Sequence, residues 1–180
     1  TEISKAAGTV CVPSGLAAVS VALLSCLKAG DHLLVTDSVY RPTRVFCDGL
    51  LKRFGVETTY FDPMIGEHIA SLFKPNTKAV FTEAPGSQSF EVQDVPGIAR
   101  VAHEHGAVVL MDNTWATPFF FSPHEMGVDL AIEAVAPLHD NLKRARIALA
   151  QRHFGVRAER RTRRLLVVLG GYGEDHTTLA

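Results

Sequence analysis

Residues 107–118, Ala107-Val-Val-Leu-Met-Asp-Asn-Thr-Trp-Ala-Thr-Pro118, join an apolar run to a carboxylate, small polar residues and the single tryptophan of the chain. Unbroken apolar residues from Val108 to Met111 are typical of a parallel strand that is covered on both faces of its sheet. Open α/β sheets bind their ligands at the carboxyl ends of such strands. This stretch therefore predicts a buried parallel strand that brings Asp112 to the edge of a sheet.

Asp112 allows two interpretations from this stretch alone. An Asp-Asn pair commonly closes a strand with a turn, and Asp112 then has a purely local role. A semi-buried carboxylate also meets a cationic group on a ligand, such as a protonated ring nitrogen or a metal ion. The rest of the sequence bears on the choice.

The composition is that of a globular chain, since 47% of the 180 residues are hydrophobic and 21% are charged. A chain of this length builds one domain with a real core. A net charge of −1 argues against a nucleic acid or a membrane surface as the main partner. No stretch approaches the roughly 20 apolar residues of a membrane span. Three dispersed cysteines, Cys11, Cys26 and Cys47, predict reduced packing residues and a cytoplasmic location.

Strand and helix patterns alternate along the chain. We expect helices over 14–28, 41–54, 65–73 and 94–105, and strands over 32–36, 56–61 and 78–83 before the Asp112 strand. Such alternation is typical of a mostly parallel sheet with crossover helices. The predicted fold class is therefore α/β.

Candidate ligand-binding residues follow or end three of these strands. They are Tyr40, the turn from Glu83 to Ser87, and Asp112. Loops that follow parallel strands converge on one crevice. The helix that begins at Ser14-Gly15 is either an ordinary capped core helix or, through its free N–H groups and its dipole, a phosphate site. Tyr40 is either a half-buried packing residue or a stacking platform for a planar ligand.

Six motifs follow one another between about residue 8 and residue 134. They are Pro13-Ser-Gly-Leu-Ala-Ala18, Gly30-Asp-His-Leu-Leu-Val-Thr-Asp-Ser-Val-Tyr40, Phe61-Asp-Pro63, Pro75-Asn-Thr-Lys78, Glu83-Ala-Pro-Gly-Ser87 and Met111-Asp-Asn-Thr-Trp-Ala116. Together they closely resemble the cysteine/methionine-metabolism family of enzymes that depend on pyridoxal 5'-phosphate. Within that family, Pro85-Gly-Ser87 followed by Glu91-Val-Gln-Asp-Val-Pro96 is most similar to the bacterial cystathionine β-lyases.

The resemblance implies the large, cofactor-binding domain of fold-type I enzymes, which has a three-layer α/β architecture. It also implies a site for pyridoxal 5'-phosphate, without a metal ion, formed by Ser14, Gly15, Leu16, Tyr40, Ser87 and Asp112. In relatives the first three positions bind the phosphate, the aromatic stacks on the pyridine ring and the acid pairs with the ring nitrogen. The position of Ser87 lies near the ring hydroxyl.

The activity that the resemblance implies is that of a carbon–sulfur lyase of transsulfuration and methionine biosynthesis. Its substrate is a thioether amino acid, and β-elimination of cystathionine gives homocysteine, pyruvate and ammonia. Relatives assemble as tetramers, so the resemblance implies a homo-oligomer. It also implies that the chain stops before the smaller domain in which relatives bind the substrate carboxylate.

The match ends after Ala134, where the family continues with a Thr-Lys-Tyr segment. In register, the lysine that holds the cofactor in relatives falls on Pro137, and the preceding threonine falls on Ala136. Lysine forms the imine and moves the α-proton, and proline has no side-chain amine for either task. Lys143 is the only later lysine, and an exposed residue of a basic segment is its simpler interpretation. We therefore expect either a lyase that is inactive in this form or a non-catalytic, cofactor-binding subunit.

The charge balance changes at the same place. Residues 1–134 hold nine Lys and Arg against fifteen Asp and Glu, a net charge of −6, and residues 135–180 hold nine against four, a net charge of +5. Eight of the nine basic residues in the second part are arginines. We expect a cofactor-binding core over 1–134 and a basic tail over 135–180 that has no family resemblance.

We hypothesise that the tail is out of frame with the family or artificially altered, because an Arg-rich segment without family resemblance starts within a few residues of a conventional motif. We expect the coding DNA to yield a Thr-Lys-Tyr segment when one base is inserted or removed near that codon. Sequencing of the gene checks this. If neither alternative frame restores the segment, the tail is a genuine departure from the family.

Overall fold

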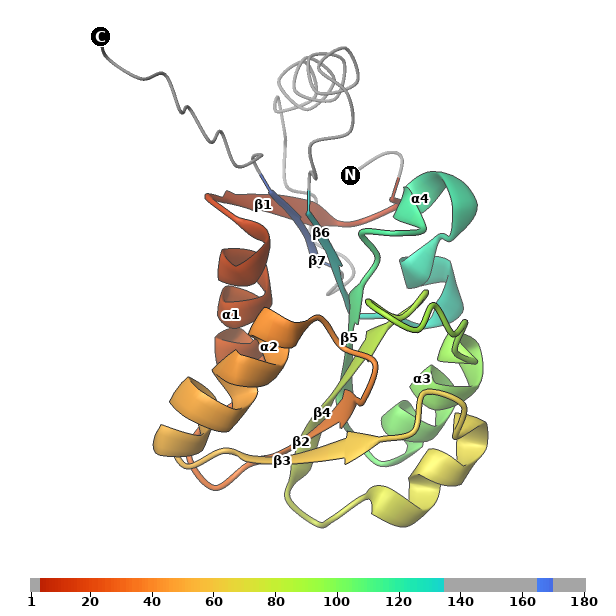
Figure 1. Ribbon diagram of the computed structural model, residues 1–180. Helices are drawn as coiled ribbons and strands as arrows, with labels where there is room; N and C mark the ends of the chain where they lie inside the picture. Colours follow the sequence, from red (N-terminus) through yellow and green to blue (C-terminus); the bar gives the residue numbers. More distant parts are fainter. Residues whose placement is uncertain (1–3, 135–164, 170–180) are drawn as a thin grey trace, which may run out of the picture.

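The Asp112 strand is the central strand of a parallel sheet. The computed structural model describes residues 4–134 and 165–169, and every strand pair within them is parallel. The seven strands lie in the order β1-β7-β6-β5-β4-β2-β3 (Figure 1). Their bounds are Gly8–Val12 (β1), His32–Thr36 (β2), Glu57–Phe61 (β3), Thr77–Glu83 (β4), Val108–Asp112 (β5), Leu130–Glu133 (β6) and Leu165–Leu169 (β7). The predicted α/β fold with a parallel sheet is confirmed.

Helices cover both faces of this sheet, and Figure 1 shows α1 and α2 on one side and α3 on the other. The helical segments are α1 (Gly15–Cys26), α2 (Arg41–Phe46), the π-helical turn η1 (Cys47–Leu51), the 3-10 segment η2 (Gly66–Leu72), α3 (Val95–Glu104), α4 (Thr117–Phe120) and the 3-10 segment η3 (Pro123–Met126). The arrangement has the three layers that the family resemblance implies.

Alternate residues of each central strand enter two separate hydrophobic cores. Phe81 and Leu110 pack in the core under α1, whereas Val80 and Met111 pack in the core under α3. A strand that is buried on both faces needs apolar residues at every position, which explains the unbroken run in β5. By the same two-residue period, Asp112 follows Leu110 toward the α1 and α2 side.

Helix α1 begins where the sequence predicts and ends earlier. Ser14 is its N-cap, and its Oγ accepts a hydrogen bond from the N–H of Ala17 at 3.2 Å. The sequence predicts helix up to residue 28, but Leu27 is extended and the Lys28 N–H donates to Asp31 Oδ2 at 2.9 Å. The carboxylate replaces the helical acceptor of this amide, so α1 stops at Cys26.

Two other predicted helices differ in type. The segment predicted as one helix over 41–54 begins as α2 and continues as the π-helical turn η1, which contains Gly49. Glycine costs about 1 kcal/mol relative to alanine in a regular helix, so the irregular turn falls where helix propensity is weakest. The segment over 65–73 is a 3-10 helix, η2. Strand β1 was not predicted by periodicity, because its side chains are exposed or only half-buried.

The three cysteines are free thiols, as predicted, but their surroundings differ. Cys47 is fully buried in the core under α1, and Cys26 is half-buried at the end of that helix. Cys11 is exposed on β1. The expectation that all three are packing residues is therefore wrong for Cys11.

Part of the region predicted as a basic tail contributes a strand to the sheet. Leu165–Leu169 form β7, which pairs with β1 on one side and β6 on the other. Residues 135–164 and 170–180 lie outside the described residues, and with them Pro137, Ala136 and Lys143. The division of the chain at residue 134 stays a prediction.

The inner and outer faces of α1 differ in their contribution to stability. Leu23 is fully buried, whereas its neighbour Leu24 is 43% exposed. We expect Leu23→Ala to lower the free energy of unfolding by about 3 kcal/mol through the cavity that it leaves. Leu24→Ala is the matched control, with an expected change within about 0.5 kcal/mol. Urea denaturation followed by circular dichroism measures both, and equal losses would contradict the placement of α1.

Candidate functional site

The ends of the parallel strands meet at one edge of the sheet. Strand β5 ends at Asp112, β4 ends at Glu83, and β2 ends at Thr36, four residues before Tyr40. Strand β1 ends at Val12, and α1 begins directly after it. Because all these strands run in the same direction, the residues that follow them lie along the same edge. The sequence-predicted site residues come from these loops.

Asp112 is buried at this edge, with 9% of its surface exposed. Its Oδ1 accepts a hydrogen bond from the Thr114 N–H at 3.0 Å, so the residue does close a turn. Burial raises the pKa of the Asp112 carboxyl, and hydrogen bonds from Thr114 oppose that effect only in part. A buried acid of this kind is stabilised as a carboxylate by a nearby cation. The turn and the ligand interpretations of Asp112 are therefore compatible.

Glu83 is the register partner of Asp112 on the neighbouring strand. It is 3% exposed, and its Oε2 accepts a hydrogen bond from the Tyr40 N–H at 2.8 Å. Burial and then the charge of Asp112 raise the pKa of Glu83 to about 8, while the Tyr40 amide and the Ser87 hydroxyl act in the opposite direction. Burial and the neighbouring acid thus both favour the protonated form of Glu83.

Sequence reasoning did not single out Glu83 as a site residue. The signal was present, because the apolar strand β4 ends on an acid in the same way as β5 ends on Asp112. Its partners, in contrast, depend on the pairing of distant segments.

Tyr40 stands at the start of α2, outside the hydrophobic cores. It is the residue before Arg41, and its side chain is 47% exposed. Ser87 lies close to the same loop, since its N–H donates to the Ser38 carbonyl at 2.9 Å. A half-exposed aromatic ring can offer a face to a planar ligand. The stacking role of Tyr40 remains a prediction.

The start of α1 offers backbone donors to an anion. The Ala17 N–H donates to Ser14 Oγ, and the Ala18 N–H donates to the Ser14 carbonyl at 3.1 Å. The N–H groups of Gly15 and Leu16 have no acceptor within a helix, since they belong to its first turn. The first turn contains no acidic residue that would repel an anion. Ser14 is a helix cap as predicted, and the phosphate role of this turn remains a prediction.

These features lie on one side of one edge. Glu83 and Asp112 each lie two residues after a residue of the core under α1, Phe81 and Leu110 respectively. Side chains two residues apart on a strand share a face, so both acids belong to the face that α1 and α2 cover. Tyr40 follows β2, which is two strands from β5, and α1 follows β1, which is three strands from β5 on the other side. That one cofactor contacts all of these residues remains a prediction.

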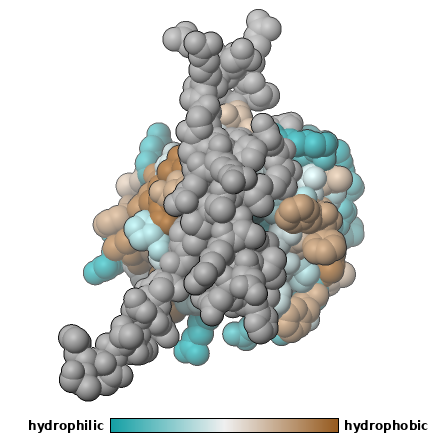
Figure 2. Space-filling view, turned by 90° about the horizontal axis from the view of Figure 1, so that it is seen from above, coloured by the Kyte–Doolittle hydropathy of each residue, from teal (hydrophilic) through white to brown (hydrophobic). Residues whose placement is uncertain are grey.

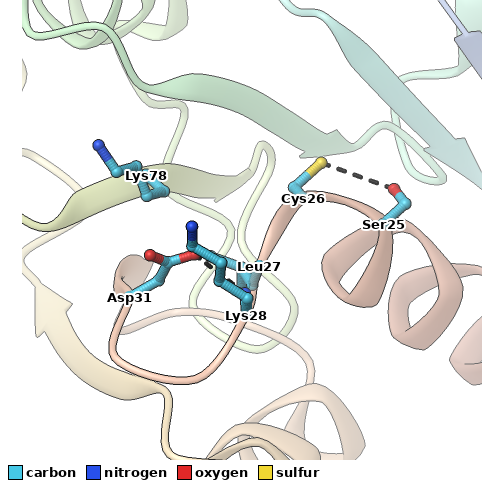
Figure 3. A pocket seen from close by; sticks show the side chains of 6 residues that line it. All are labelled: Ser25, Cys26, Leu27, Lys28, Asp31 and Lys78. Atoms are coloured by element: carbon cyan, nitrogen blue, oxygen red, sulfur yellow. Dashed lines mark hydrogen bonds between the residues drawn. The ribbon is translucent and has the colours of Figure 1, made fainter.

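A hollow of about 360 Å³ lies elsewhere, between the end of α1 and the starts of β2 and β4 (Figure 3). Its lining comprises Ser25, Cys26, Leu27, Lys28, Asp31 and Lys78. Ligands of open parallel sheets bind at the carboxyl ends of the strands, and this hollow is at the amino ends. It is therefore not the candidate site.

Residues 4–134 and 165–169 contain neither a metal-binding cluster nor a membrane-spanning helix. No group of three His, Cys, Asp or Glu side chains is placed to hold a metal ion. No helix there combines the length and apolar character needed to cross a membrane.

Comparison with known proteins shows the family of this chain. The model of the family of Cys/Met metabolism PLP-dependent enzymes matches residues 1–136. The chain therefore belongs to this family, whose cofactor is pyridoxal 5'-phosphate. The site has features that fit that cofactor: a buried acid, a half-exposed aromatic and a free helix start.

The chain is 62% identical over 128 residues to a protein of Rhizobium johnstonii assigned provisionally as a cystathionine beta-lyase, covering 71% of this chain and 32% of that protein. It is 42% identical over 135 residues to the cystathionine beta-lyase of Escherichia coli K12, covering 74% and 34%. The crystal structure of cystathionine gamma-lyase from Lactobacillus plantarum with L-serine aligns with a TM-score of 0.62 and 34% identity, over 64% of this chain and 30% of that one. The chain thus spans about a third of the length of these relatives.

The raised pKa of Glu83 makes stability depend on pH. Between its usual value of 4.5 and about 8, folded Glu83 holds a proton that the unfolded chain has released. The free energy of unfolding therefore falls as the pH rises through this window, by up to about 1.4 kcal/mol per pH unit. Glu83→Gln removes this contribution, so its stability should fall less steeply over the same range. Urea unfolding at several pH values measures the difference, and identical slopes would show that Glu83 is ionised throughout.

Proposed function

We propose that the chain carries the cofactor site of a carbon–sulfur lyase of the cystathionine β-lyase type, which acts on a thioether amino acid. The observation that carries this proposal is the buried Asp112 at the end of the central strand of a family member. The reaction is β-elimination of cystathionine to homocysteine, pyruvate and ammonia. Support for this substrate comes from the names of the relatives in Rhizobium johnstonii and Escherichia coli.

Each site residue has a role that its surroundings allow. Asp112 would accept a hydrogen bond from the protonated pyridine nitrogen and favour its charge, because a buried carboxylate favours a neighbouring cation. Tyr40 would stack on the ring, and Ser87 would interact with the ring hydroxyl. Ser14, Gly15 and Leu16 would hold the phosphate at the start of α1. When bound, the cofactor acts as an electron sink for the bond changes at the amino acid.

Assembly into a homo-oligomer belongs to the same proposal. Among the described residues, five large aromatic residues are more than half exposed, namely Phe54, Phe90, Trp115, Phe119 and Phe120. Figure 2 shows hydrophobic residues gathered in separate areas of the face that it presents. Exposed apolar areas commonly mark contact surfaces.

The cytoplasmic location expected from the cysteines also stays a prediction.

A second candidate function is cofactor binding without catalysis. It is favoured by Pro137 at the position of the lysine in the family register, outside the described residues. An imine to the cofactor and transfer of the α-proton both need an amine at that position. We therefore propose that this form of the chain binds pyridoxal 5'-phosphate reversibly and does not turn over cystathionine.

Binding of pyridoxal 5'-phosphate tests both candidates. We expect reversible binding that Asp112→Asn weakens at least about tenfold, since a buried hydrogen bond between charged groups is lost. Asp62→Asn is the matched control. Like Asp112, Asp62 accepts a hydrogen bond from the N–H of the residue two positions later, here Met64 at 2.8 Å. Unlike Asp112, it is exposed, directly after β3. Absorbance titration measures the affinities, and equal effects of the two substitutions would contradict the site.

Borohydride reduction followed by mass spectrometry then separates the two candidates. We expect no lysine to be labelled specifically by the cofactor. A label on Lys143 together with cleavage of cystathionine would instead establish an active lyase with a displaced lysine.

A further inference from the structure

Glu83 joins two parts of the proposed cofactor site. Its carboxyl oxygen accepts the Tyr40 N–H at 2.8 Å, and its strand position is in register with Asp112. One side chain therefore stands between the residue proposed to stack on the ring and the residue proposed to bind the ring nitrogen. The family resemblance assigns no role to this position.

The end of β4 that carries Glu83 is held firmly. The Glu83 carbonyl accepts a hydrogen bond from Gln93 Nε2 at 2.9 Å, and the same nitrogen donates to Thr36 Oγ1 at 2.8 Å. Thr36 and Gln93 are buried, with 0% and 5% exposure. Because these bonds join the ends of β2 and β4, Glu83 is a fixed point to which a loop can be attached.

Tyr40, in contrast, is held mainly through its backbone. No side-chain hydrogen bond caps the start of α2 at Tyr40, and nearly half of its side chain is exposed. Its N–H precedes the first turn of α2 and has no helical acceptor. The Glu83 carboxyl is thus the acceptor of the Tyr40 N–H, and this bond acts beside the backbone hydrogen bond from Ser87 to Ser38 in holding the loop.

We propose that Glu83 is a positioning residue of this site, whose carboxyl group holds the backbone of Tyr40 at a fixed separation from Asp112. The inference rests on the proposed function, in which those two residues contact opposite parts of one ring. Glu83 itself does not contact the ring. Without this acceptor the Tyr40 loop would be free to move. The aromatic side chain would then stack less well on a cofactor ring whose nitrogen is bound by Asp112.

The direction in which the pKa of Glu83 is shifted agrees with this role. The groups that act on it are Asp112 on β5, the Tyr40 amide on the β2–α2 loop and the Ser87 hydroxyl on the loop after β4. Burial and the charge of Asp112 both favour the neutral carboxyl. A neutral Glu83 still accepts the Tyr40 N–H through an oxygen lone pair. A glutamine at this position should therefore serve almost as well at neutral pH.

The test compares Glu83→Gln, Glu83→Ala and Glu83→Leu in the full chain. The first readout is exchange of the Tyr40 amide hydrogen by NMR without cofactor. We expect Gln to keep the protection of this amide, and Ala and Leu to raise its exchange rate about tenfold or more. Leucine fills the space of the side chain without an acceptor, so it replaces alanine if the alanine variant does not fold. Glu57→Ala, at an exposed glutamate on β3, is the control and should not affect Tyr40.

The second readout is the affinity for pyridoxal 5'-phosphate at neutral pH. We expect Gln to remain within about threefold of the parent chain and the variants without an acceptor to lose about five- to tenfold. Unchanged Tyr40 exchange in a folded Ala or Leu variant would overturn the proposal, as would a Gln variant that loses as much affinity as Leu. If no variant and not even the parent binds the cofactor while Tyr40 exchange still responds, the proposed function fails and the positioning of Tyr40 by Glu83 is supported.

Discussion

The pairing of β4 with β5 brings two acids, Glu83 and Asp112, to the same place at the edge of the sheet. Both are buried, and two buried carboxylates side by side repel each other, so the pair holds a proton more tightly than isolated acids. The structure accommodates this cost with the amides of Thr114 and Tyr40, each of which donates to one of the acids. A cation at Asp112 would relieve the remaining cost, which is why this edge is suited to a protonated ring nitrogen.

The rest of the fold places partners around these acids. Helices α1 and α2 cover the face of the sheet on which the acids lie, and both helices begin at the edge where the strands end. A helix start supplies N–H donors, and the start of α2 supplies an aromatic ring. The opposite face, covered by α3 and η2, contains apolar contacts around Met111 and Val80. Both faces of the sheet thus hold an apolar core, and the proposed site lies at the edge of the face covered by α1 and α2.

Membership of the family and the absence of its lysine from the expected position lead to different expectations for catalysis. In the proposed site, the residues for phosphate binding, stacking and charge pairing all precede position 135, whereas the imine would need a residue at position 137 in this register. The proposal therefore separates holding the cofactor from using it. The chain matches about a third of the length of its relatives. The proposed site is therefore described only for the residues in this third.

The sequence by itself determined the α/β class, the position of the Asp112 strand and the N-cap at Ser14, because these follow from local signals: unbroken apolar runs, alternation of strand and helix patterns, and a capping serine. It also carried the family resemblance through six motifs in order. The tertiary structure alone decided that β7 inserts between β1 and β6, that Asp31 ends α1 early, and that Glu83 accepts the amide of Tyr40. These features depend on contacts between segments, two of them distant along the chain, and periodicity within one segment contains no information about such pairings.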